Sequence, residues 1–190
     1  MNIVGILLAA GAGSRFGGGK LAHPIPPDGL PLSLVAYRNL KSVLDTVIVV
    51  VRADDATVRS IFEDEGARLA LCPDAREGMG RSLAAGIDAA TDADGWVIAL
   101  GDMPKVAPQT IRRVAAALEA GASIAAPVHE GRRGHPVGFS SAHRLALTGL
   151  RGDQGARNVL TTCADQIRPV PVEDPGIHTD IDTREDAARL

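Results

Sequence analysis

The residues best suited to chemistry gather near the start of the chain, where a short apolar run ends in a glycine-rich segment. After Leu8, Ala9 and Ala10 this segment contains Gly11, Gly13, Ser14, Arg15, Gly17, Gly18, Gly19 and Lys20. Glycines let backbone N–H groups approach a phosphate closely, and the two basic side chains supply the positive charge that a polyphosphate needs. The segment predicts a phosphate-binding loop, and the alternative is a glycine-rich turn without a ligand.

Two familiar phosphate loops do not match this segment. A Walker A loop requires glycine six positions before its lysine and a hydroxyl residue after it, but Ser14 and Leu21 hold those positions. The dinucleotide fingerprint G-x-G-x-x-G fails because Phe16 takes the place of the third glycine, and because the next predicted strand ends at Arg52 rather than at an acidic residue. The sequence therefore indicates a phosphate loop of another type.

Carboxylates follow apolar runs at two distant places. Asp102 comes directly after the run that ends at Leu100, and Asp182 lies in Asp180-Ile181-Asp182, whose alternation turns both aspartates away from Ile181. Carboxylates at the carboxyl ends of strands can hold Mg²⁺ against phosphate oxygens. We predict that Asp102 and Asp182 meet on one Mg²⁺, although both could instead cap turns, and Thr183 is a plausible N-cap for a final helix.

Three further segments suggest ligand contacts. Ser82 follows a Gly-x-Gly turn, where it could face an oxygen-rich ligand or serve only as an N-cap. Arginines accompany glycines in two later clusters, and such clusters can receive an anionic acceptor through bidentate hydrogen bonds. The predicted acceptor-binding residues are Arg132, Arg133, His135 and Arg157. The alternatives are a solvated basic turn for the arginines and a structural role for His135, which precedes a proline.

Apolar runs alternate with helix-period segments along the chain, which predicts an α/β fold with a mostly parallel central sheet. The expected strands are 2–9, 46–51, 68–71, 95–100, 123–127 and 167–170, and the expected helices are 32–41, 55–65, 81–90, 108–120, 141–147, 155–163 and 184–189. Residues 23–32 are expected to form a surface loop, and residues 129–139 a hairpin or lid. We predict one domain over residues 1–190, with ligands at the carboxyl ends of the strands.

Composition excludes several other classes of protein. A net charge of −3 and an aromatic content of 3% argue against nucleic-acid binding, which relies on basic surfaces and stacking platforms. Cys72 and Cys163 are too few for a secreted disulfide scaffold, and the apolar run from Ile3 to Ala10 is too short to span a membrane. The expected location is the cytoplasm, with no membrane partner.

The ordered motifs resemble those of the MobA-like nucleotidyltransferases, with the cytidylyltransferases of the molybdenum cofactor as the closest branch. The resemblance rests on Leu8-Ala9-Ala10-Gly11-x-Gly13-Ser14-Arg15-Phe16-Gly17 with Lys20, Gly101-Asp102-Met103-Pro104, Gly134-His135-Pro136-Val137, Gly152-Asp153-x-Gly155-Ala156-Arg157 and Asp180-Ile181-Asp182-Thr183. It implies a Rossmann-like three-layer sandwich. It also implies a nucleotide site formed by Leu8, Ala9, Ala10, Gly11, Gly13, Ser14, Arg15, Lys20, Ser82 and Asp102.

The resemblance further implies transfer of a nucleoside monophosphate from a nucleoside triphosphate to a phosphorylated acceptor, with Mg²⁺ and release of pyrophosphate. Arg15, Lys20 and Asp102 are the expected catalytic residues, and Ala10, where the guanylyl branch prefers glycine, favours CTP over GTP. Molybdopterin is the expected acceptor, and a molybdenum hydroxylase or its maturation factor an expected partner. The alternatives are a molybdopterin guanylyltransferase, a sugar- or polyol-phosphate cytidylyltransferase, and a non-catalytic nucleotide-binding delivery partner of a molybdenum hydroxylase.

Overall fold

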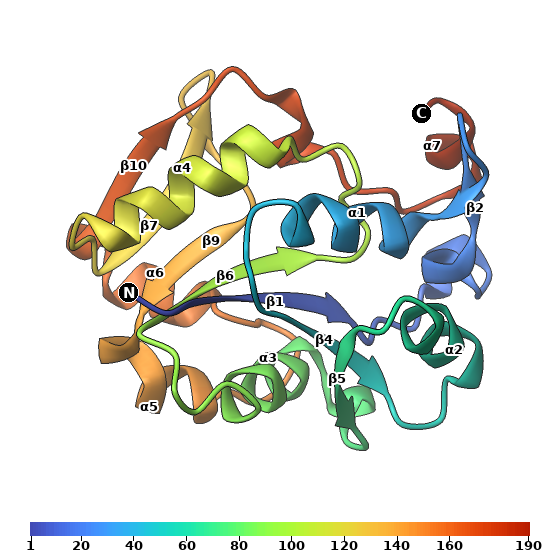
Figure 1. Cartoon of the computed structure of the whole chain (residues 1–190), viewed down its shortest axis with the longest axis horizontal. Coiled ribbons are helices and arrows are strands. Elements are labelled where there is room, and N and C mark those ends of the chain that lie inside the picture. Colours follow the sequence, from blue (N-terminus) through green and yellow to red (C-terminus); the bar gives the residue numbers. More distant parts are fainter.

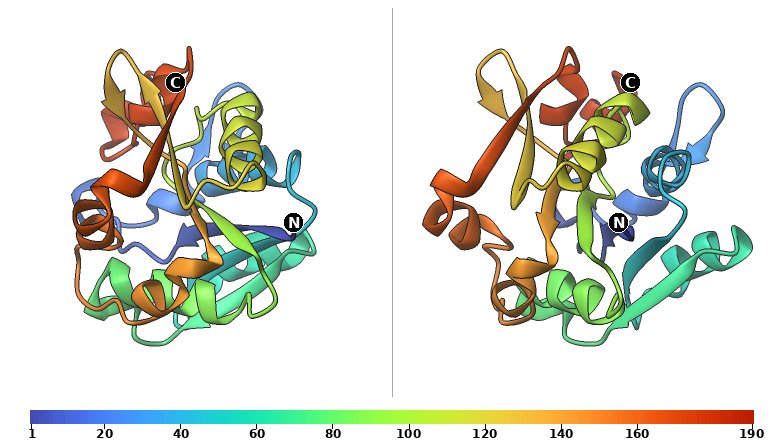
Figure 2. Two further views of the ribbon diagram at one scale, coloured as in Figure 1. Left: turned by 90° about the vertical axis from the view of Figure 1, so that its left-hand side faces the viewer. Right: turned by 60° about the vertical axis from the view of Figure 1, so that its left-hand side comes forward.

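The computed structural model describes residues 1–190, whose central feature is an eight-stranded sheet with helices on both faces (Figures 1 and 2). The strands follow the order β10-β7-β9-β6-β1-β4-β5, and β8 pairs with β7. They comprise β1 (Ile3–Ala9), β4 (Val47–Arg52), β5 (Arg68–Cys72), β6 (Gly95–Leu100), β7 (Ile124–His129), β8 (Arg132–Arg133), β9 (Val137–Ser140) and β10 (Ile167–Pro171). The helices are α1 (Leu32–Lys41), α2 (Ala56–Asp64), α3 (Met79–Asp88), α4 (Pro108–Glu119), α5 (Arg144–Thr148), α6 (Arg157–Thr162) and α7 (Arg184–Ala188).

The layers follow from alternation along the central strands. Leu7 and Val49 belong to one apolar core with residues of α1, α2 and α4, whereas Ile6 and Val50 belong to a second core with residues of α3, α5 and α6. Because successive strand residues point to opposite faces, each buried strand supplies both cores. The predicted α/β three-layer sandwich with a mostly parallel sheet is confirmed.

Parallel pairing brings the chemistry to one edge of the sheet. Strand β1 pairs in parallel with β6 on one side and with β4 on the other. All three carboxyl ends therefore lie at the same edge, where β1 continues into the glycine-rich segment, β4 ends at Arg52 and β6 continues to Asp102. This is the edge at which open α/β sheets bind ligands.

Four parts of the sequence-based prediction need correction. The expected hairpin at 129–139 contains the β7–β8 hairpin, but its last residues belong to β9, which was not predicted as a strand of the sheet and lies antiparallel between β6 and β7. The expected surface loop at 23–32 contains a small hairpin of β2 (Pro24–Ile25) and β3 (Leu30–Pro31), with Gly29 at φ 67° in the turn. The expected helix at 141–147 is a 3₁₀ turn, Ser141–His143, followed by α5. Helix α3 begins at Met79 rather than at Arg81, so its N-cap is Gly78 and Ser82 is not an N-cap.

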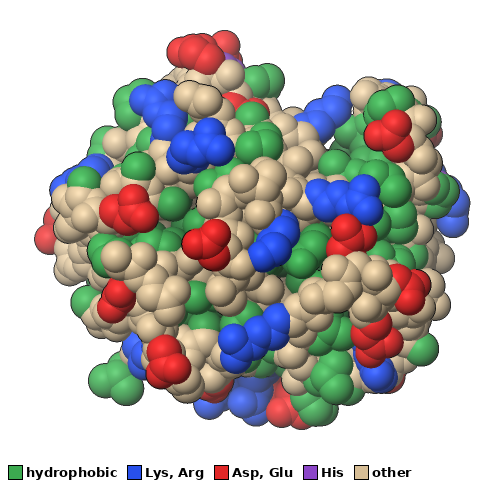
Figure 3. Space-filling model, in the orientation of Figure 1, with side chains coloured by type: hydrophobic (Ala, Val, Ile, Leu, Met, Phe, Trp, Pro, Cys, Tyr) green, Lys and Arg blue, Asp and Glu red, His purple; other side chains and the backbone are tan.

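The surface is of mixed charge. Acidic and basic side chains are interspersed over the face seen in Figure 3, which has the orientation of Figure 1. No helix of the chain combines the length and the apolar character that crossing a membrane requires.

Candidate active site

The glycine-rich segment after β1 folds back on itself. Gly13 has φ 60° and ψ 36°, a left-handed conformation that glycine adopts without steric cost, and a Cβ there would lie 2.9 Å from Cβ of Lys20. The Gly13 carbonyl accepts hydrogen bonds from the N–H groups of Phe16 (3.0 Å) and Gly18 (3.2 Å). The returning loop places Lys20 beside the end of β6, so the glycines position the lysine as well as exposing backbone N–H groups.

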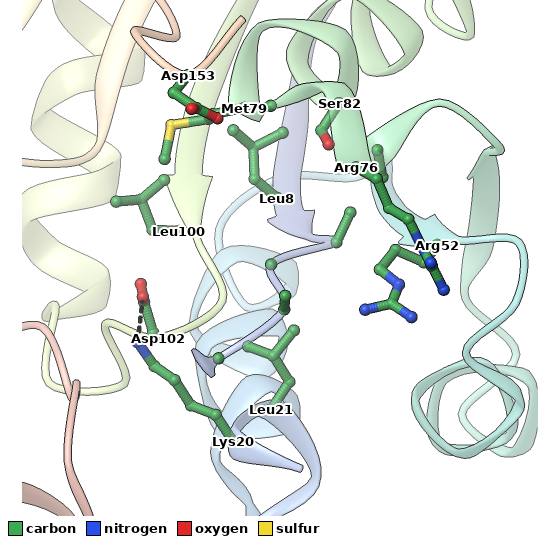
Figure 4. A pocket seen from close by; sticks show the side chains of 16 residues that line it. Leu8, Lys20, Leu21, Arg52, Arg76, Met79, Ser82, Leu100, Asp102 and Asp153 are labelled. Atoms are coloured by element: carbon green, nitrogen blue, oxygen red, sulfur yellow. Dashed lines mark hydrogen bonds and ion pairs between the residues drawn. The ribbon is translucent and has the colours of Figure 1, made fainter. Parts of the chain in front are cut away.

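Lys20 joins two carboxylates from distant parts of the chain. Its Nζ donates to Asp102 Oδ2 at 2.8 Å and to Asp182 Oδ1 at 2.9 Å, and only 8% of its side chain is exposed (Figure 4 draws the contact with Asp102). Arg15, whose side chain is exposed, adds a contact from Nη1 to Asp182 Oδ2 at 2.7 Å. The predicted meeting of Asp102 and Asp182 therefore occurs, with the ammonium group of Lys20 between them.

Local structure around the C-terminal segment holds Asp182 in place. The N–H of buried Ile181 donates to the backbone carbonyl of Asp102 at 3.0 Å, which docks the segment directly against the end of β6. Thr183 caps α7 through a reciprocal capping box with Asp186, as the sequence predicted for Thr183. Arg184 then stacks its guanidinium over the Phe16 ring at 5.1 Å, so α7 also contacts the glycine-rich loop.

The ion cluster shifts the pKa values of its members. Burial by itself lowers the pKa of Lys20, but the hydrogen bonds and charges of Asp102 and Asp182 outweigh burial and raise it above its ordinary value. The hydrogen bond from Lys20 is the main reason that the pKa of Asp182 is lowered. Lys20 and Asp182 therefore stabilise each other in their charged forms.

The carboxylates fit the ligand preferences of a hard divalent cation. Asp102 Oδ1 is buried and has no hydrogen-bond partner, so one carboxylate oxygen remains available for a cation. The chain has no group of three or more His, Cys, Asp or Glu side chains arranged to hold a metal. In nucleotide sites Mg²⁺ typically binds one or two carboxylates, and water and substrate phosphates complete its coordination shell. Asp102 and Asp182 could hold such an ion.

A cavity of about 340 Å³ opens beside this cluster, at the carboxyl ends of β1 and β6 (Figure 4). Its lining includes seven of the predicted nucleotide-binding residues: Leu8, Ala10, Gly11, Gly13, Lys20, Ser82 and Asp102. Ala9, Ser14 and Arg15 do not line it, and Ala9 is buried in the core. The structure thus brings most of the predicted nucleotide site to one cavity.

Other residues of this cavity escaped the sequence analysis. Arg52, Arg76 and Asp153 line it together with Met79 and Leu100. Arg52 was taken as the end of a strand, and Arg76 lies in a 3₁₀ turn, Ala75–Glu77, that no pattern predicted. A charged residue at the carboxyl end of a buried parallel strand was the available signal for Arg52.

A second cavity, of about 680 Å³, lies next to the first and shares Leu8, Met79, Leu100 and Asp153 with it. Three of the predicted acceptor residues, Arg133, His135 and Arg157, line this cavity, whereas the exposed Arg132 does not. His135 Nδ1 is buried without a hydrogen-bond partner, and burial lowers the pKa of this histidine. The second cavity therefore combines basic groups with a largely apolar lining.

Two loops meet where the cavities join. The N–H of Gly80 donates to the carbonyl of Gly152 at 2.8 Å, and a Cβ at Gly78 would lie only 2.3 Å from the carbonyl carbon of Gly152. Gly78 has φ 118°, so both its conformation and its surroundings require glycine. This contact sets the start of α3, and with it Ser82, against the segment that carries Asp153 and Arg157.

The fold and the paired cavities define a nucleotide-binding α/β protein, and comparison with known proteins assigns its family. Residues 5–168 match the MobA-like NTP transferase domain, so the chain belongs to the MobA-like NTP transferase family. Purine catabolism protein PucB of Bacillus subtilis (strain 168) is 34% identical over 97% of this chain and 93% of its own length. Nicotine blue oxidoreductase of Paenarthrobacter nicotinovorans is 30% identical over 99% of this chain and 96% of its own length.

Solved structures agree with this assignment. Rv0371c from Mycobacterium tuberculosis H37Rv is 27% identical, with a TM-score of 0.86 over 100% of this chain and 96% of that chain. A structure of Rv0371c in complex with manganese is 26% identical, with a TM-score of 0.82 over 100% of this chain and 98% of that chain. A related protein of the same fold has therefore been observed with a divalent metal.

We predict that Lys20→Met lowers the free energy of unfolding at pH 7 by roughly 1–3 kcal/mol, because two carboxylates lose a shared charged donor. The pKa of Asp182 is lowered from 3.8 in the folded protein. The stability that its contact with Lys20 contributes is therefore fully present above pH 3.8, and it is lost as the pH falls through the lower pKa of the folded state. Urea unfolding should therefore show a difference between wild type and variant that shrinks below about pH 4. Lys41→Met, which removes an exposed lysine on α1, is the control, and a difference independent of pH would contradict the assignment.

Proposed function

We propose that this protein transfers CMP from CTP to a phosphorylated acceptor, with molybdopterin as the acceptor, and releases pyrophosphate. The observation that carries the proposal is the junction of Lys20 with Asp102 and Asp182 beside a glycine-rich loop. The junction combines phosphate-binding groups with carboxylates suited to a divalent cation, and both are required to move a nucleotidyl group. Membership of the MobA-like NTP transferase family supports the reaction class.

In the proposed mechanism the loop holds the triphosphate through its backbone N–H groups and the cations of Arg15 and Lys20. Asp102 and Asp182 would hold Mg²⁺, which neutralises charge on the phosphate oxygens when it is bound. An oxygen of the acceptor's phosphate forms a bond to the α-phosphorus of CTP as the bond between the α-phosphorus and the bridging oxygen to the β-phosphorus breaks. The products are a diphosphate-linked dinucleotide and pyrophosphate, so atoms and charge balance.

This reaction needs no general base, because a phosphate acceptor is already ionised at neutral pH. Positioning and charge neutralisation are sufficient, and the residues around the cavity are suited to both. Arg15 and Lys20 would also stabilise the charge that develops on the leaving pyrophosphate. The Arg15 side chain is exposed and contacts Asp182 from the surface, which suits a side chain that binds a departing product.

The second cavity supports a large, partly apolar acceptor with an anionic group. Arg133, His135 and Arg157 would hold the acceptor's phosphate, while side chains such as Leu83 and Phe139 would contact its ring system. Arg132 lies outside the cavity lining and is not proposed as a contact. Delivery of the product to a molybdenum hydroxylase or its maturation factor, in the cytoplasm, completes the proposal.

Other members of this reaction class remain the competing functions. Transfer of GMP to molybdopterin and transfer of CMP to a sugar or polyol phosphate use the same loop and carboxylates. A nucleotide-binding protein without catalysis would bind nucleotide and release no pyrophosphate. Because one relative is named nicotine blue oxidoreductase, an assay for oxidoreductase activity belongs in the same set.

We predict that Asp102→Asn and Asp182→Asn each remain folded, lose most pyrophosphate release and require more Mg²⁺ for the remainder. An amide oxygen caps a turn nearly as well as a carboxylate, but it binds a divalent cation much less strongly. The measurement is a Mg²⁺ titration of pyrophosphate release with CTP and acceptor, together with the melting curve of each variant. Asp64→Asn, which changes an exposed carboxylate on α2 away from the site, is the matched control. Wild-type turnover and Mg²⁺ dependence in Asp102→Asn would refute this role.

We also predict that CTP supports a higher kcat/KM than GTP and that Ala10→Gly reduces this preference. Ala10 lines the nucleotide cavity and is only 7% exposed, so its methyl group occupies space that a purine would need. Steady-state kinetics with both nucleotides measure the ratio. An equal or higher kcat/KM with GTP in the wild-type protein would show that the base preference is assigned incorrectly.

A further inference from the structure

Two arginines of the first cavity are held by a single carboxylate. Asp54 Oδ1 accepts from Arg52 Nε at 2.9 Å, and Asp54 Oδ2 accepts from Arg76 Nη2 at 2.6 Å. The hydrogen bond from Arg52, followed by that from Arg76, lowers the pKa of Asp54 to about 2, so this carboxylate is ionised at neutral pH. The two guanidinium groups therefore share one counter-ion.

The arginines lie on the other side of the cavity from the proposed phosphate site. Arg52 ends β4 and Asp102 follows β6, and both strands pair with β1 from opposite sides. Two strand spacings separate β4 from β6, so their carboxyl ends are about 10 Å apart. Figure 4 shows Arg52 and Arg76 together, with Leu8 and Leu21 between them and the pair Lys20 and Asp102. A nucleotide whose phosphates lie at Lys20 would extend its base toward the arginines.

The contacts with Asp54 leave some N–H donors of the two guanidinium groups free. Because Arg52 contacts Asp54 only through Nε, both of its Nη groups remain available. Its side chain is 21% exposed, whereas that of Arg76 is 76% exposed, so Arg52 is the more confined of the two. A guanidinium group is a planar donor without any acceptor, and it pairs with two adjacent acceptor atoms. The side of the cavity formed by Arg52 and Arg76 can therefore form hydrogen bonds only with a base edge that presents acceptors.

We propose that Arg52 and Arg76, oriented by Asp54, read the base edge of the nucleotide and select cytosine or guanine over uracil and adenine. Cytosine presents N3 and O2 as adjacent acceptors, and guanine presents O6 and N7. Uracil carries a donor at N3, and adenine carries an amino donor beside N7, so neither edge accepts both hydrogen bonds. This inference rests on the proposed binding of a nucleotide in the first cavity, and it is independent of the choice between CTP and GTP attributed to Ala10.

The test is calorimetric binding of CTP, UTP, GTP, ATP and inorganic tripolyphosphate in the presence of Mg²⁺. The wild-type protein should bind CTP about 10-fold more tightly than UTP, and GTP about 10-fold more tightly than ATP, the discrimination expected of one bidentate contact. Arg52→Gln should remove both preferences and leave the affinity for tripolyphosphate unchanged. Arg52→Lys, which retains the charge but loses the planar donor pair, should do the same.

Two further variants complete the design. Asp54→Asn should reduce both preferences in part, because the guanidinium groups lose the carboxylate that orients them. Arg38→Gln, which breaks an ion pair with Glu65 outside the cavity, is the matched control and should retain wild-type selectivity. Equal binding of CTP and UTP by the wild-type protein would overturn the inference. If Arg52→Gln loses CTP binding and tripolyphosphate binding to the same extent, the inference is also overturned, because Arg52 would then bind the phosphates rather than the base. If the wild-type protein binds neither nucleotide nor tripolyphosphate, the proposed function itself fails.

Discussion

The site depends on one buried ammonium group that is shared by two carboxylates. Lys20 Nζ contacts Asp102 and Asp182, which come from distant parts of the chain. Taking a lysine out of water is unfavourable unless opposite charges accompany it, and two carboxylates at short distance repel each other unless a cation lies between them. The requirement for charge balance therefore ties the glycine-rich loop, the end of β6 and the segment before α7 into one site.

The same constraint links the site to the rest of the fold. Ile181 donates to the backbone of Asp102, and Arg184 stacks on Phe16, so α7 is fastened both to the sheet edge and to the loop. Parallel pairing of β6, β1 and β4 brings the glycine-rich loop, Asp102 and Arg52 to the same edge. Contact between Gly80 and Gly152 then sets the second cavity beside the first.

Much of this arrangement could be predicted from local signals in the sequence. The apolar run before Gly11 and the carboxylate after Leu100 are readable because buried parallel strands are continuous apolar segments whose ends carry ligands. Thr183 could be predicted as an N-cap because a hydroxyl residue directly before a helical segment is a local signal. The sequence analysis also expected a cation between Asp102 and Asp182, but it did not identify Lys20 as the group that fills that place in the protein itself.

The features that escaped prediction depend on contacts between distant residues. Strand β9 is only four residues long, and its place between β6 and β7 is set by pairing on both sides rather than by its own composition. The role proposed for Arg52 depends on its contact with Asp54, which also binds Arg76, and these residues come together only when β4 and the turn after β5 are side by side. The N-cap alternative for Ser82 is wrong because the start of α3 is set by contacts of Gly78 and Gly80 with Gly152, which no local pattern contains.

The proposed function requires that the ion cluster and the two cavities transfer a nucleotidyl group rather than hydrolyse or only bind a nucleotide. The most direct measurement follows the fate of a phosphorus label, with CTP labelled at either its α- or its γ-phosphate and incubated with protein, Mg²⁺ and molybdopterin. The account predicts that the α-label appears in a diphosphate-linked product of the acceptor and the γ-label in pyrophosphate, in equal amounts. Recovery of the α-label only as free CMP, of the γ-label as inorganic phosphate, or of both labels in unchanged CTP would contradict it.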